Sequence, residues 1–260
     1  MTASSETFSE LLPDADNLLT EDETPVDNLA SEKLQRLLVE VLYSNRDLIY
    51  PERQFLAAAN VGLYYAVRQN PLVPDVFLSL DVQVAEDWWQ KKNRVYLTWE
   101  FGKPPEVVIE IVSNLVGNED GSKLRDYARA GVLYYVIFDP LNQLKQGVLR
   151  LYKLQGWLYV PISETWMAEV GLGLILWEGS YEGKEEVWLR WCDRQGKIIP
   201  TGAELAQQER QRAEQERQRA EQERQRAEQE KEKRQRLVER LRSLSPEQLT
   251  ELGISLADLE

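Results

Sequence analysis

The chain has 260 residues, of which 43% are hydrophobic, including 8 Trp, 11 Tyr and 5 Phe, and this is enough to build a substantial core. It contains no histidine. That absence excludes Ser-His-Asp and Cys-His nucleophile systems, histidine general bases and nearly every zinc site. Any chemistry must therefore use carboxylates, lysine, tyrosine or a hard metal ion bound through oxygen.

Segments for export or membrane insertion are not expected. No window approaches about 18 consecutive apolar residues, and the first residues lack a basic stretch followed by an apolar run. The single cysteine, Cys192, leaves no internal disulfide and fits a reducing compartment. We therefore expect a cytoplasmic protein.

The net charge of −13 is concentrated near the N-terminus, where residues 1–32 carry nine acidic side chains and no basic one. The remainder is close to neutral, so it lacks the basic surface that tight, non-specific nucleic-acid binding requires. A nuclease remains compatible with this balance, because its metal ions supply positive charge locally.

Two different segments open the chain. Residues 1–30 are acidic and aperiodic, with Pro13 and Pro25, and we expect a disordered arm. An amphipathic helix is expected over residues 32–43, with Ser31 as its N-cap. Its apolar residues recur at helical spacing: Leu34, Leu37, Leu38, Val41 and Leu42.

Residues 31–200 are expected to form an α/β domain. Short apolar runs predict strands over residues 55–59, 63–67, 75–80, 107–112 and 133–138, with more strands over 148–195. The aliphatic run 107–112 suits a strand buried on both faces. A helix over 123–130, ended by Gly131, separates it from the strand over 133–138. Strand, helix and strand form a βαβ unit, which predicts a mixed sheet flanked by helices.

A heptad repeat, AQQERQR or AEQERQR, fills much of residues 201–242. Each heptad offers one alanine, whereas a coiled coil needs two apolar positions. A single solvated helix and a weak dimeric coiled coil therefore both stay open, and a homodimer could form through this helix or through the core. Over 243–260, Ser245 followed by Pro246 and Gln248 predicts a short terminal helix.

Two carboxylates stand where carboxylates are costly to bury. Asp75 follows a proline and opens an apolar strand, and Glu110 lies within the most aliphatic strand. If the strands are neighbours, Asp75 and Glu110 can hold one Mg²⁺, with the backbone carbonyl of Ile111 as a further ligand. The alternative is an aspartate that caps a turn and a glutamate paired with an internal cation.

Three segments in order, PDVFLSLD (74–81), PPEVVIEIVSN (104–114) and GSKLRDYARAGVLYYVIFDP (121–140), resemble the Uma2 family of restriction-endonuclease-like proteins. The resemblance covers residues 31–200. It implies the PD-(D/E)XK nuclease fold, in which a mixed sheet has helices on both faces and a metal site at one end. It also implies that Asp75 is the first acid of the site and Glu110 the second.

One position departs from the superfamily pattern, because Val112 stands where a lysine is usual. The resemblance implies that Lys123, on the next helix, takes over and steadies the attacking hydroxide or the scissile phosphate. Tyr127, four residues on, faces the same way. Glu40 is a weaker candidate for a third acid. The plainer alternatives are solvated residues at Lys123 and Glu40 and a packed ring at Tyr127.

From these features we expect a DNA endonuclease that depends on Mg²⁺ or Mn²⁺, with DNA as its substrate. The rival hypothesis is a nuclease fold that no longer cuts and acts as a binding or assembly module. The near-neutral domain and the long polar tail favour the rival. The acid inside an aliphatic strand favours the enzyme, because a scaffold does not need one there.

Overall fold

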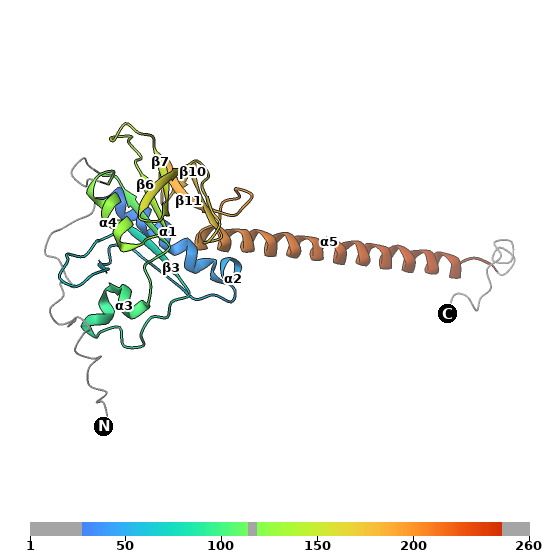
Figure 1. Cartoon of the computed structure of the whole chain (residues 1–260). Coiled ribbons are helices and arrows are strands. Elements are labelled where there is room, and N and C mark those ends of the chain that lie inside the picture. The colour runs from blue at the N-terminus through green and yellow to red at the C-terminus, as the bar shows by residue number, and fades with distance from the viewer. Residues whose placement is uncertain (1–27, 114–118, 246–260) are drawn as a thin grey trace, which may run out of the picture. The chain divides into compact units, whose positions relative to one another are not determined.

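The computed structural model describes residues 28–113 and 119–245 (Figure 1). Contacts divide the chain into two compact units, Met1–Gly202 and Ala203–Glu260. The expected arm, except for residues 28–30, and nearly all of the expected terminal helix lie outside the described residues.

A six-stranded mixed sheet in the order β1-β3-β5-β6-β7-β8 forms the centre of the first unit. Its strands are β1 (Phe55–Ala58), β3 (Val76–Leu80), β5 (Val107–Ile111), β6 (Tyr134–Phe138), β7 (Leu149–Gln155) and β8 (Leu158–Ile162). Strands β5 and β6 are parallel and are connected through helix α4 (Ser122–Ala130), and the other neighbours are antiparallel. The α/β class and the βαβ unit are thus confirmed.

Two layers cover the sheet. One face packs against helix α1 (Leu29–Ser44) and a second sheet made of β9 (Trp166–Met167), β10 (Leu172–Tyr181) and β11 (Lys184–Cys192). The other face packs against α4 and the parallel pair β2 (Leu63–Tyr64) and β4 (Tyr96–Leu97). Because side chains alternate along a strand, Ile109 of β5 faces α1, and Val108 and Glu110 face α4.

Helix α1 begins earlier than expected, and Ser31 is not its cap. The N-cap is Asn28, whose Oδ1 accepts hydrogen bonds from the backbone N–H groups of Ala30 (3.0 Å) and Ser31 (2.9 Å). Asparagine satisfies these donors as well as serine does. Ser31 is buried in the first turn instead.

Three short helices complete the first unit: α2 (Arg46–Ile49), the 3₁₀ helix η3 (Lys91–Arg94) and α3 (Thr98–Phe101). The strand expected over 63–67 is only two residues long, and Arg68 soon after it turns in the left-handed region with φ of 62°. Gly131 ends α4 as expected, with φ of 83°.

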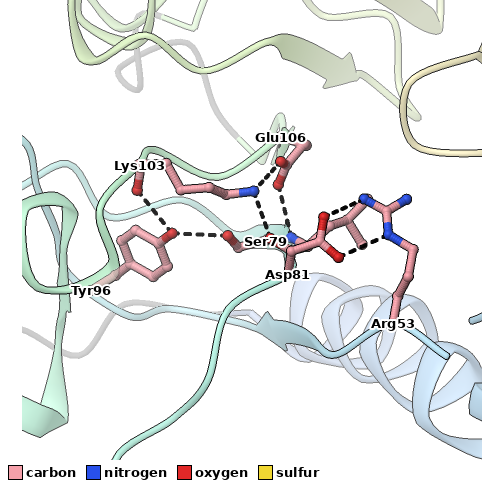
Figure 2. A network of polar contacts seen from close by, with 7 residues as sticks. Arg53, Ser79, Asp81, Tyr96, Lys103 and Glu106 are labelled. Atoms are coloured by element: carbon pink, nitrogen blue, oxygen red, sulfur yellow. Dashed lines mark hydrogen bonds and ion pairs between the residues drawn. The ribbon is translucent and has the colours of Figure 1, made fainter.

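A polar network fixes the end of β3 (Figure 2). The Nζ of Lys103 donates to the carbonyl oxygen of Leu80 (2.6 Å) and pairs with Glu106, whose Oε2 accepts from the amide of Leu80 (2.8 Å). The Nε and Nη2 of Arg53 both donate to the carboxylate of Asp81, at 2.9 and 2.6 Å. These contacts hold β3 beside β5 and so help to position the residue that precedes β3.

Helix α5 (Gly202–Arg242) has 41 residues, none of which is buried, as expected for the solvated repeat. Within residues 28–113 and 119–245, no helix is long and apolar enough to cross a membrane.

Candidate functional site

The two predicted acids lie side by side because of the strand register. In the antiparallel pair of β3 and β5, Val76 is opposite Ile109. Asp75, immediately before β3, therefore comes next to Glu110, within β5. The side chain of Glu110 is only 1% exposed, so this acid lies inside the domain and close to the end of its strand.

Helix α4 supplies both partners of Glu110. The Nζ of Lys123 lies 2.7 Å from Oε2 of Glu110, and the hydroxyl of Tyr127 donates to its Oε1 at 2.6 Å. Positions i and i+4 of a helix lie on one face, so a single helix can bind both oxygens of one carboxylate. Lys123 remains 31% exposed, and Tyr127 is fully buried.

Asp75 is held by two donors from other elements. Its Oδ2 accepts from the backbone N–H of Ile111 (2.6 Å), and its Oδ1 accepts from Nε2 of Gln35 in α1 (3.1 Å). Sequence reasoning missed Gln35. The signal was present, because Gln35 is a polar residue next to Leu34 on the apolar face of that helix.

Burial and charge together set the protonation of the site. Burial raises the pKa of Glu110 to about 8; the ammonium of Lys123 opposes this rise and the charge of Asp75 adds to it. Burial lowers the pKa of Lys123, but Glu110, Asp75 and Glu119 outweigh that effect and leave it raised. The two acids therefore lie close enough to repel each other, which favours a cation between them.

The donor atoms fit a hard divalent cation. Two carboxylates and a backbone carbonyl are oxygen donors, and Mg²⁺ is commonly bound through one or two carboxylates while it keeps several waters. Among the described residues there is no group of three or more acidic, histidine or cysteine side chains arranged to hold a metal. The site therefore suits Mg²⁺ or Mn²⁺ better than an ion that needs a full protein cage.

Glu119 is a second residue that sequence reasoning missed. It is buried, and its Oε1 lies 3.7 Å from Nζ of Lys123. Its Oε2 makes no hydrogen bond with any described residue. Its sequence context is polar and carries no apolar pattern, so nothing in the sequence marked it as buried.

Glu40 lies apart from this group. Its Oε1 accepts hydrogen bonds from the hydroxyl of Ser44 and the backbone N–H of Gly202. Five positions separate Glu40 from Gln35, which at 100° per residue turns the two side chains about 140° apart around the helix. Gln35, and not Glu40, is the residue of α1 that reaches the acid pair.

The mixed sheet with helices on both faces defines a protein of the PD-(D/E)XK-like fold, and the acid pair lies where β3 begins and β5 ends. The chain belongs to the Uma2 family, whose model, described as "putative restriction endonuclease", matches residues 17–177. The resemblance seen in the sequence is thereby confirmed. No protein of curated function matches the chain.

Proposed function

We propose that the protein is a metal-dependent endonuclease that hydrolyses phosphodiester bonds of DNA. The observation that carries this proposal is the meeting of Asp75, Glu110 and Lys123 at one end of the sheet, in a member of a family of restriction-endonuclease-like proteins. A buried acid pair with an ammonium group beside it is costly for a scaffold and useful for phosphodiester hydrolysis.

Asp75, Glu110 and the backbone carbonyl of Ile111 would hold Mg²⁺ or Mn²⁺. Such an ion supplies an activated water and neutralises charge that develops on the phosphate. Lys123, with Nζ 2.7 Å from the carboxylate of Glu110, can stabilise negative charge on the attacking oxygen or on the scissile phosphate.

The remaining contacts orient the ligands. Tyr127 fixes one oxygen of Glu110, and Gln35 with the amide of Ile111 fixes Asp75. Residues that hold a ligand by hydrogen bonds reduce the reorganisation that metal binding requires. Gln35 and Tyr127 are therefore positioning residues in this proposal.

Cleavage of supercoiled and single-stranded DNA with Mg²⁺ or Mn²⁺ tests the proposal. Asp75→Asn and Glu110→Gln should each lower the cleavage rate by roughly a hundredfold or more, because each removes a charged metal ligand. Glu100→Gln is the matched control, since Glu100 is an exposed carboxylate in α3, and it should leave the rate unchanged.

Calorimetric titration with Mn²⁺ separates the proposal from its rival. Metal binding that is lost in both ligand variants would support the enzyme. A folded wild-type protein that neither binds metal nor cuts any DNA would contradict the proposal and leave a nuclease fold that acts as a binding module.

A further inference from the structure

Arg150 in β7 has a guanidinium group whose hydrogen bonds are incomplete. Its Nη1 donates to Oε1 of Gln146 at 2.6 Å. Its Nε and Nη2 are buried but make no hydrogen bond with any residue that the structure describes. Unpaired buried donors on a cation are costly. The two nitrogens therefore point to a ligand with acceptor oxygens.

The strand register places Arg150 in the same row as the acid pair. Glu110 of β5 is opposite Ile137 of β6, and Ile137 is opposite Arg150 of β7. Residues directly opposite each other across strands point to the same face of a sheet. Two strand spacings separate the backbones of Glu110 and Arg150, which is about 10 Å. Arg150 thus lies on the α4 side of the sheet, near the proposed metal ligands.

A polar chain orients the guanidinium. Gln146 accepts from Arg150 and donates through Nε2 to Oδ2 of Asp120 at 2.9 Å. Asp120 lies three residues before Lys123, so the chain connects Arg150 to the start of α4. No ion pair joins Arg150 to an acidic residue within the described part of the chain. Gln146 holds the group, and the Nε and Nη2 edge remains available.

We propose that Arg150 binds a backbone phosphate of the nucleic-acid substrate through Nε and Nη2. This inference rests on the proposed nuclease function. These two nitrogens form one edge of the guanidinium, which matches two oxygens of a phosphate or carboxylate. Arg53 uses the same Nε and Nη2 edge to bind both oxygens of Asp81 in this protein.

The proposal also explains how a domain with little net positive charge can bind a polyanion. A uniformly basic surface is not needed if one buried guanidinium and the ammonium of Lys123 lie on the same side of the sheet as the metal. Charge-assisted hydrogen bonds from partly buried groups are stronger than exposed ones, because water competes less for them.

Fluorescence anisotropy with a short labelled DNA duplex tests the role, in Ca²⁺ to bind DNA while suppressing cleavage. Arg150→Gln should weaken binding by about tenfold or more and reduce the salt dependence of log K by about 1. Arg150→Lys keeps the charge but loses the two-nitrogen edge, so its affinity should be intermediate. Arg194→Gln removes an exposed positive charge and should bind like wild type.

Thermal unfolding without DNA separates a binding role from a structural one. If Arg150 awaits a ligand, Arg150→Gln should unfold at the wild-type temperature or above, because it removes an unpaired buried cation. Wild-type DNA affinity and salt dependence in Arg150→Gln would overturn this inference and leave metal-dependent cleavage intact. Failure of the wild-type protein to bind DNA in any metal would overturn both proposals.

Discussion

Glu110 carries two hydrogen bonds that come from a single helix, one from an ammonium group and one from a phenol. The pair leaves one side of the carboxylate fixed by Tyr127 and the other under the control of Lys123. A buried acid in this position is held in orientation without losing its charge partner. This division predicts separate effects for the two α4 residues.

Tyr127→Phe should lower the free energy of unfolding by about 1–3 kcal/mol, because it leaves a buried carboxylate oxygen without a donor. It should also slow metal-dependent cleavage, because Glu110 loses its orientation. Urea denaturation and the cleavage assay measure the two effects. Tyr152→Phe is the control, since the hydroxyl of Tyr152 makes no hydrogen bond with any described residue. Equal behaviour of the two variants would contradict the role of Tyr127.

Glu169 predicts a pH dependence of stability. Hydrogen bonds from Lys153 and Tyr134 lower the pKa of Glu169 from 4.5 to about 2. The ionised form therefore stabilises the fold; this contribution is complete above about pH 4.5 and is lost as the pH falls toward 2. Because the pair is largely exposed, the effect is small.

Melting temperatures of wild type and Glu169→Gln, compared from neutral pH downward, measure this contribution. Wild type should be the more stable of the two at neutral pH, and the difference should shrink as the solution is acidified below about pH 4.5. A difference that stays constant over this range would show that the carboxylate charge of Glu169 is irrelevant to stability.

At single residues, the sequence was informative where chemistry conflicted with pattern. Asp75 and Glu110 stood out because each is a carboxylate in an apolar run. Arg150 and Glu119 did not, because their burial depends on the neighbours that distant strands and helices bring to them. Long-range register decides which polar residues lose contact with water, and local sequence does not encode it.

At the level of elements, the N-terminus of α1 gives a direct test. Asn28→Ala should lower the free energy of unfolding by about 1 kcal/mol, because two backbone N–H groups lose their acceptor. Asn28→Asp should have little effect, because aspartate is an equally good cap. Chemical denaturation measures both. A larger loss in Ser31→Ala than in Asn28→Ala would return the cap to Ser31.

The long apolar strands and the α4 helix were predicted within one or two residues, because several residues of each agree in period and end at glycine or proline. The parallel pairing of β2 with β4 was not predicted. Each has only two residues, which is too short for a pattern, and the partner lies beyond the intervening strand β3. Tertiary packing alone determines such elements.

At the level of the whole molecule, the heptad repeat bears on assembly. Each heptad of α5 presents one alanine, and such a thin apolar stripe gives little hydrophobic gain from pairing. We predict that the full chain sediments as a monomer over a wide concentration range. A dimer that forms with increasing concentration and dissociates in an Ala213→Glu, Ala220→Glu variant would contradict this prediction and establish the coiled coil.

The repeat of α5 also makes its length adjustable in fixed increments. Residues 213–219 and 220–226 are identical heptads, so gaining or losing one copy leaves the sequence pattern on both sides unchanged. At 1.5 Å per residue, each copy alters the helix length by about 10 Å. It changes the angular position of the downstream residues by only about 20°. Loss of four residues would instead rotate those residues by about 40°. The helix is thus built like a ruler whose natural unit is seven residues.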